Sequence, residues 1–228
     1  TLARQGIAVN LISSQPSERA QSVLAEGGIN AALNTMGEND SPAEHFADTM
    51  KGGCCLESEG AVKNLTDNAP AVVTELVRLG VPLRSENGRL ILRNFGGQKK
   101  KRTAYAQSST GKVIMTALID EARKYEAEGL IKRFSHHELA ALDIKGGALK
   151  SFALRDSYGK GCLRMNGPLI MCTGGLNGIF EGITTGTTQN TGNAAALAFA
   201  AGVEFANLEF IQYHPTTAAI SDKVMLIS

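Results

Sequence analysis

The chain has 228 residues, enough for one large domain. Hydrophobic residues make up 43% and charged residues 20% of the sequence, as in an ordinary globular protein, and the formal net charge is +1. A nearly neutral chain gives no electrostatic reason to expect a nucleic-acid or membrane-surface partner, and no apolar run reaches the ~18 residues that a membrane span needs.

The first residues predict the end of a helix followed by a strand. Thr1–Gln5 have the character of a last helical turn, and Gly6 is a residue type that ends helices. The apolar run Ile7–Ile12 then predicts a buried parallel strand. Helix, glycine and strand form the second half of a βαβ unit. We therefore expect the first half, with any glycine-rich dinucleotide fingerprint, to lie outside this sequence.

Four later segments have helical signatures. Ser41 is a good N-cap and Pro42 suits the first helical position, and apolar residues elsewhere recur at helical spacing. The predicted helices are Pro42–Met50, Val62–Leu79, Thr110–Glu126 and Gly192–Gly202.

Strand signals fill much of the remaining chain. A short strand is predicted at Leu90–Leu92 and a buried one at Pro168–Cys172. Four segments separated by Gly-Gly and Tyr-Gly turns predict an antiparallel meander: Leu130–Phe134, Glu138–Ile144, Ala148–Asp156 and Gly161–Asn166. The pattern indicates an α/β fold with a parallel sheet and an inserted β-meander.

The cysteines and histidines do not predict a metal site. Cys54, Cys55, Cys162 and Cys172 form no CxxC or Cys/His pattern, and we interpret them as reduced thiols of an intracellular protein. His214 precedes Pro215, which favours an extended or turn backbone. A lone histidine of this kind is either a hydrogen-bond donor to a ligand or a structural residue.

Glycine-rich turns are the strongest candidates for ligand contacts. Gly27-Gly28, the pair after Phe95, and Thr173-Gly174-Gly175 after a predicted strand can each let a ligand approach the backbone closely. The sequence from Thr191 to Asn193 opens a predicted helix, and helix N-termini bind anions. Taken singly, each is also explained as an ordinary turn or cap.

The order of these motifs resembles the flavoprotein subunits of succinate dehydrogenases and fumarate reductases. The motifs are GGINAA, FGG followed by RTAYA and TG, then TGG, then TG before an alanine-rich helix, and EF.Q.HPT at the end. The resemblance extends from Ile7 to Ser228, and L-aspartate oxidase belongs to the same superfamily.

The resemblance implies an FAD-binding domain of the two-dinucleotide-fold type, incomplete in this chain and ending at the start of a capping domain. Residues 1–218 would form the partial FAD-binding domain, without its N-terminal βα half-unit, and 219–228 would begin the capping domain. The family's proton-donating arginine would lie beyond Ser228. The 228 residues alone are therefore not expected to be catalytically competent.

Site residues follow from the resemblance position by position. Those that match FAD contacts are Ser13, Ser14, Ser22, Glu26, Gly27, Gly28, Thr173, Gly174, Gly175 and Asn193. Those that match the dicarboxylate site are Phe95, His214 and Ser228.

Three positions depart from the family pattern, and the first affects the expected chemistry. Gln21 stands where many respiratory members attach FAD covalently through a histidine, so we expect non-covalent FAD. Glu26 replaces a glutamine that is common in the family, and Asn193 replaces a common aspartate.

The implied activity is the interconversion of fumarate and succinate by hydride transfer with FAD. The implied partners are the dicarboxylate and, for the whole protein, an iron–sulfur subunit, with membrane contact only through such a complex. The implied location is the cytoplasm or the inner face of the cell membrane. Two alternatives remain: L-aspartate oxidase, which Phe95 disfavours because it cannot pair with an ammonium group, and a non-catalytic FAD-binding module.

Overall fold

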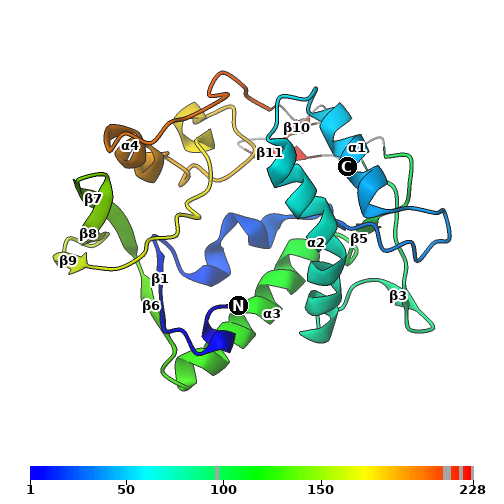
Figure 1. Ribbon diagram of the computed structural model, residues 1–228, viewed down its shortest axis with the longest axis horizontal. Helices are drawn as coiled ribbons and strands as arrows, with labels where there is room; N and C mark the ends of the chain where they lie inside the picture. Colours follow the sequence, from blue (N-terminus) through cyan, green and yellow to red (C-terminus); the bar gives the residue numbers. More distant parts are fainter. Residues whose placement is uncertain (96–97, 213–216, 221–222, 227–228) are drawn as a thin grey trace. The chain divides into compact units, whose positions relative to one another are not determined.

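The first part of the chain contains the long helices. The computed structural model describes residues 1–95, 98–212, 217–220 and 223–226 (Figure 1). Helix α1 (Pro42–Gly52) begins as the sequence predicts, because the Ser41 hydroxyl accepts a hydrogen bond from the Glu44 N–H at 3.2 Å. Helices α2 (Glu59–Arg78) and α3 (Thr110–Ala127) confirm the two predicted long helices.

Contacts within the chain define two compact units, and each has its own core. Unit 1 consists of Thr1–Val9 and Ser17–Ile131, and unit 2 of Asn10–Pro16 and Lys132–Ser228. The expected boundary at residue 218 stays a prediction.

The core of unit 1 lies between α2 and two short strand pairs. Ala69, Val73 and Leu76 project from α2 against Leu83 and Leu92. Strand β2 (Ile29–Asn30) pairs antiparallel with β5 (Thr103–Ala104), and β3 (Ser85–Glu86) pairs with β4 (Arg89–Leu90). Three short 3-10 helices complete the unit: η1 (Ala3–Gln5), η2 (Ser17–Arg19) and η3 (Gln21–Leu24).

Unit 2 is built around an antiparallel meander. Strands β7 (His137–Lys145), β8 (Ala148–Asp156) and β9 (Cys162–Met165) pair in that order, and Leu139, Phe152 and Leu154 pack against Ala194. Ala194 belongs to α4 (Asn193–Ala200). The other elements are β1 (Val9–Ser13), β6 (Ile131–Ser135), η4 (Asn177–Phe180) and the hairpin of β10 (Thr217–Ile220) and β11 (Lys223–Leu226).

The meander has three strands rather than the four that were predicted. Strand β6 pairs with β1, whereas β8 is the strand that pairs with β7 among the described residues. His136 lies between β6 and β7 with φ +61°, a left-handed conformation that interrupts an extended chain. This local break separates β6 from the meander and leaves it to pair with a strand from much earlier in the sequence.

Two apolar segments are less buried than predicted. Residues 168–172 form no strand, and Ile170 is 71% exposed. In β1 the Leu11 side chain is 41% exposed. A central parallel strand needs a neighbour on each side, and the described residues provide one for β1 and none for 168–172.

Among the described residues, no helix combines the length and the apolar character needed to cross a bilayer. The four cysteines are free thiols, and all are exposed.

Candidate functional site

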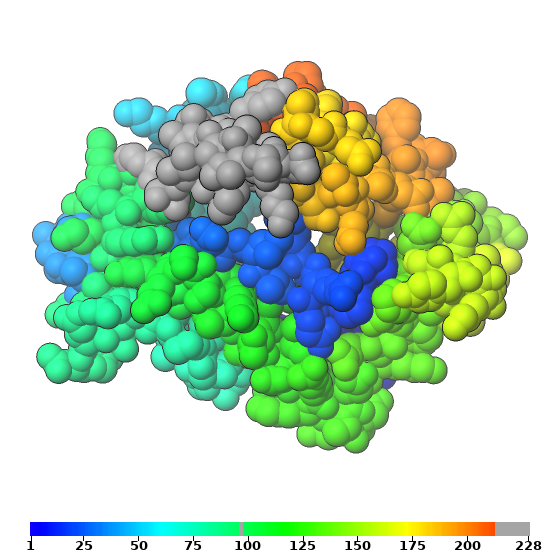
Figure 2. Space-filling view, turned by 180° about the vertical axis from the view of Figure 1, so that it is seen from behind, coloured from blue at the N-terminus to red at the C-terminus, as the bar shows by residue number. Residues whose placement is uncertain are grey.

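The predicted FAD-contacting residues of unit 1 lie in one exposed segment, from Ser22 to Gly28. Figure 2 shows this blue segment beside the green residues of α3, which η3 contacts directly. The Gly111 N–H, at the start of α3, donates to the Ala25 carbonyl at 2.7 Å. The Thr110 hydroxyl donates to the Glu26 carbonyl at 3.3 Å and accepts from the Ala106 N–H at 3.0 Å. The TG motif thus holds the segment in place.

Gly28 is fixed by its approach to β5. Its φ of +144° is rarely adopted by residues with a side chain. A Cβ at this position would lie 2.5 Å from Thr103 Cγ2 and 2.7 Å from the Ala104 carbonyl oxygen. Only glycine therefore lets this part of the segment pack against the RTAYA block.

Gly27 and Phe95 lie together, although the sequence assigned one to the flavin and the other to the substrate. A Cβ at Gly27 would be 3.2 Å from Phe95 Cζ, and the Phe95 side chain is 40% exposed. The Arg93 guanidinium donates to the Gly27 carbonyl at 2.7 Å through Nη2. It lies 5.4 Å from the Phe95 ring centroid and 4.4 Å from that of Tyr105.

Unit 1 also contains a buried ion-pair cluster. The Arg102 side chain is 1% exposed, and its Nη2 lies 2.8 Å from Asp40 Oδ1 and 3.0 Å from Asp48 Oδ2. The Arg102 carbonyl accepts from the Ala31 N–H at 2.8 Å, next to the β2–β5 pair. His45 is buried beside the cluster, and burial, followed by repulsion from Arg102, lowers the pKa of its imidazole.

Sequence reasoning missed Arg93, Tyr105 and the cluster around Arg102. Arg93 stands just before FGG, whereas Arg102 and Tyr105 belong to the RTAYA motif, for which no role was assigned. Gly27, the hydrogen-bond partner of Arg93, lies 66 positions earlier in the chain, and Asp40, one of the partners of Arg102, lies 62 positions earlier.

In unit 2, Ser13 and Ser14 lie at the carboxyl end of β1, where α/β sheets present ligand contacts. The Ser13 hydroxyl donates to the Gln15 carbonyl at 2.5 Å and accepts from the Gln15 N–H at 3.3 Å. Ser14 is exposed and directly follows the strand.

The TGG turn, Thr173 to Gly175, is exposed. Gly174 has φ +72°, and a Cβ there would lie 2.8 Å from Asn190 Oδ1. An added Cβ at Gly175 would meet no atom within 4 Å, so its backbone is open.

Asn193 is the first residue of α4. Its side-chain amide donates to the Leu139 carbonyl at 2.9 Å, which ties the helix to β7. Within the part of the chain that the structure describes, no side chain caps the first turn of α4, and its N-cap residue, Gly192, has φ +73°. The N-terminal amides of this helix are therefore not occupied by a capping side chain.

The residues present fit FAD. Exposed glycine backbone in each unit allows the close approach that a flat ring or a pyrophosphate requires. The uncapped start of α4 offers amides and a partial positive charge that suit a phosphate. The predicted FAD contacts are Ser22 to Gly28 within unit 1 and, within unit 2, the serine, TGG and Asn193 positions; this assignment stays a prediction. His214 and Ser228 lie outside the described residues.

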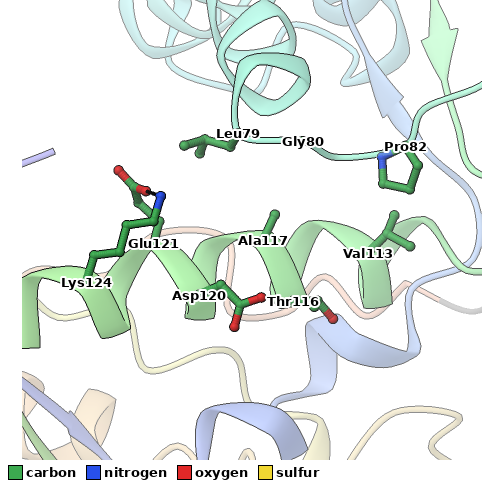
Figure 3. A pocket seen from close by; sticks show the side chains of 9 residues that line it. All are labelled: Leu79, Gly80, Pro82, Val113, Thr116, Ala117, Asp120, Glu121 and Lys124. Atoms are coloured by element: carbon green, nitrogen blue, oxygen red, sulfur yellow. Dashed lines mark hydrogen bonds and ion pairs between the residues drawn. The ribbon is translucent and has the colours of Figure 1, made fainter. Parts of the chain in front are cut away.

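A separate pocket of about 220 Å³ lies between the end of α2 and α3 (Figure 3). Leu79, Pro82 and Val113 line it together with Glu121 and Lys124, which form an ion pair at 2.7 Å. None of the predicted site residues lines this pocket, and it is smaller than the roughly 300 Å³ at which small-molecule sites begin. It is not a candidate for the FAD site.

Comparison with known proteins agrees with the motif order. The chain is 40% identical over 240 residues to the succinate dehydrogenase flavoprotein subunit of Bacillus subtilis (strain 168), covering 99% of this chain and 39% of the relative. It is 34% identical over 216 residues to the L-aspartate oxidase of Mesorhizobium japonicum, covering 90% and 39%. The chain thus spans about two fifths of the length of these relatives.

A solved structure supports the fold. The quinol fumarate reductase of E. coli matches with a TM-score of 0.89 at 27% identity, over 99% of this chain and 37% of that chain. This match confirms the predicted α/β class with a parallel sheet and antiparallel strands.

The model of the FAD binding domain family matches residues 1–227, almost the whole chain. FAD, the cofactor that the motifs predict, is the ligand that gives this family its description. The chain therefore belongs to the FAD binding domain family.

Proposed function

We propose that the protein carrying this chain is an FAD-dependent oxidoreductase that interconverts fumarate and succinate. Its relatives include proteins named succinate dehydrogenase and fumarate reductase flavoprotein subunits, and these names support the proposal. An iron–sulfur subunit is the proposed electron partner of the whole protein. Contact with a membrane is proposed only through such a complex, at its cytoplasmic face.

The observation that carries the proposal is the packing of Phe95 against Gly27. The ring forms an apolar wall beside the segment assigned to the flavin, with the Arg93 guanidinium next to it. An apolar ring with a neighbouring cation suits the flat carbon skeleton and the negative charge of a dicarboxylate. It offers no carboxylate to a substrate ammonium group, as an amino-acid oxidase requires.

The residues have separate proposed roles. When bound, FAD supplies hydride transfer at its ring. Phe95 would exclude water from the reacting carbons, and His214 would donate a hydrogen bond to a substrate carboxylate and stabilise charge that develops there. Ser228 is proposed as a further contact to the dicarboxylate.

The alternative is L-aspartate oxidase, because one relative with that name is 34% identical to the chain. The two functions are separated by assays on the full-length protein that contains this sequence, purified with its flavin. We expect fumarate-dependent oxidation of a reduced viologen dye, and no hydrogen peroxide when L-aspartate is added in air. The alternative would be established by two results together. The protein would form peroxide from L-aspartate, and it would not reduce fumarate with the viologen dye when aspartate is absent.

A further inference from the structure

The side chain of Arg93 joins the two parts of the site in unit 1. Its Nη2 donates to the Gly27 carbonyl at 2.7 Å, and its guanidinium lies by the rings of Phe95 and Tyr105. Two rings restrict the plane of the guanidinium, so the direction of its hydrogen bond to Gly27 is also restricted.

This bond orients the whole Gly27–Gly28 peptide. The peptide is trans, so the Gly28 N–H points away from the Gly27 carbonyl that Arg93 holds. Gly28 is exposed, and no hydrogen bond among the described residues engages its N–H. A cation on the carbonyl side polarises the peptide and makes the N–H on the other side a stronger donor.

The charge of Arg93 is also less compensated than that of its buried neighbour. Arg102 has two carboxylates, Asp40 and Asp48, within 3.0 Å. None of the ion pairs found among the described residues involves Arg93, and its buried Nε has no hydrogen-bond partner there. Its positive charge therefore remains available to act on groups that bind beside Gly27 and Gly28.

We propose that Arg93 is a positioning residue that orients the Gly28 N–H toward the flavin and uses its unpaired charge to favour the reduced form of the cofactor. Reduction adds electron density to the flavin ring, and a nearby positive charge stabilises that form more than the oxidised form. The inference rests on the proposed function, because it places the flavin ring at Gly27 and Gly28.

The test uses the full-length flavoprotein with bound FAD and two substitutions at this position. Arg93→Gln removes the charge, whereas Arg93→Lys keeps the charge but loses the flat stacking between the two rings. The matched control is Arg84→Gln, since Arg84 is an exposed arginine of the same unit that is paired with Glu86 at 2.7 Å. Flavin content, unfolding temperature and flavin midpoint potential are measured for each protein.

We expect Arg93→Gln to bind reduced flavin about tenfold less tightly relative to oxidised flavin, which lowers the midpoint potential by about 30 mV. Arg93→Lys should keep the wild-type potential while binding FAD more weakly, and Arg84→Gln should match wild type in both. A purely structural arginine would lower the unfolding temperature in both Arg93 variants without moving the potential, and that outcome overturns the proposal.

If Arg93→Gln is recovered without flavin, its potential cannot be measured, and the flavin content and midpoint potential of Arg93→Lys decide between the outcomes. Flavin retained at the wild-type potential supports the proposal, and flavin lost from both variants overturns the electrostatic role. A wild-type protein that binds no FAD refutes the proposed function itself. If the wild-type protein binds FAD and Arg93→Gln has the same flavin midpoint potential as the wild type, only the inference about Arg93 is refuted.

Discussion

At the scale of single residues, two glycines in equivalent helical positions have different reasons to be glycine. Gly111 is the second residue of α3, and Gly60 is the second residue of α2. A Cβ at Gly111 would overlap the Ser22 carbonyl oxygen and lie 2.8 Å from Ala25 Cβ, whereas at Gly60 it would meet nothing within 4 Å. Gly111 therefore positions the Ser22–Gly28 segment, and Gly60 does not.

We expect Gly111→Ala to destabilise the protein by about 1–3 kcal/mol, as overpacking does, and to lower the bound FAD because the Ser22–Gly28 segment must move. The matched Gly60→Ala should stabilise by up to about 1 kcal/mol, since alanine is the better helix former. Urea unfolding and flavin absorbance measure both effects. Equal flavin content in the two variants would show that Gly111 does not position the segment.

His45 is expected to make stability depend on pH. Burial and the positive charge of Arg102 lower the pKa of its imidazole below the ordinary 6.5, although Asp40 and Asp48 act in the opposite direction. The unfolded chain then binds a proton at a higher pH than the folded one. The contribution to stability is complete above about pH 6.5 and decreases as pH falls below it, by at most about 1.4 kcal/mol per pH unit.

The check is a series of urea unfolding curves between pH 7.5 and 5.0. Replacing His45 by Gln removes the titrating group, so the difference in stability between the wild-type protein and this variant should shrink, or change sign in favour of the variant, as the pH falls. His136, which is partly exposed, provides the control substitution His136→Gln. A difference that is constant over the whole range would contradict the prediction.

At the scale of elements, helices were more predictable than strand partners. The ends of α1, α2 and α3 agree with the sequence pattern to within three residues, because helical periodicity, and in α1 the Ser41 cap, act over short stretches of the chain. The pairing of β1 with β6 depends instead on a partner far along the chain, and the left-handed residue His136 gives no signal in composition. The approximate extents of β6 to β9 were therefore predictable, but the membership of the meander was not.

Helix α2 contains Pro70 in its interior. The apolar periodicity that predicted this helix takes no account of the proline. A proline there has no N–H for the Thr66 carbonyl, and its ring crowds the preceding turn. We expect Pro70→Ala to stabilise the protein by about 2 kcal/mol. This is less than the ~3 kcal/mol difference in helix propensity between proline and alanine, because alanine also raises the conformational entropy of the unfolded chain.

Pro42 supplies the matched control, because it occupies the first turn of α1, where no hydrogen bond is lost. Pro42→Ala should leave stability unchanged or lower it by less than about 1 kcal/mol. Thermal unfolding of the two variants compares them directly. A decrease in stability for Pro70→Ala would contradict the prediction.

At the scale of the whole molecule, the order of motifs was sufficient to identify the family. The buried residues that support the predicted site could not be identified from the sequence. Gly27, Gly28 and Phe95 were predicted from the sequence to be site residues, and the structure brings Gly27 and Phe95 together. Arg93 and Arg102 were not named, because their roles arise from contacts across 66 and 62 positions. Residues that contact a ligand often occur in short sequence motifs. The residues that support them come together only on folding, from distant parts of the chain.

Gln21 bears on how the complete protein holds FAD. Gln21, at the start of η3, is exposed and has a primary amide rather than a nucleophilic ring nitrogen. We therefore expect FAD to bind without a covalent bond, so that its removal is reversible. Adding FAD at about 100 times its dissociation constant should then stabilise the protein by about 2.7 kcal/mol.

Two denaturants test the prediction. Acid precipitation and neutral guanidinium, each followed by separation of protein from small molecules, should both leave the flavin absorbance in the small-molecule fraction. The neutral denaturant is the control against acid cleavage of a labile bond. Absorbance that stays with the protein in both treatments would contradict the prediction, and peptide mapping would then identify the attached residue. Release followed by recovery of the unfolding temperature on adding FAD would show that a reversible equilibrium, and not a covalent linkage, couples the cofactor to the stability of the fold.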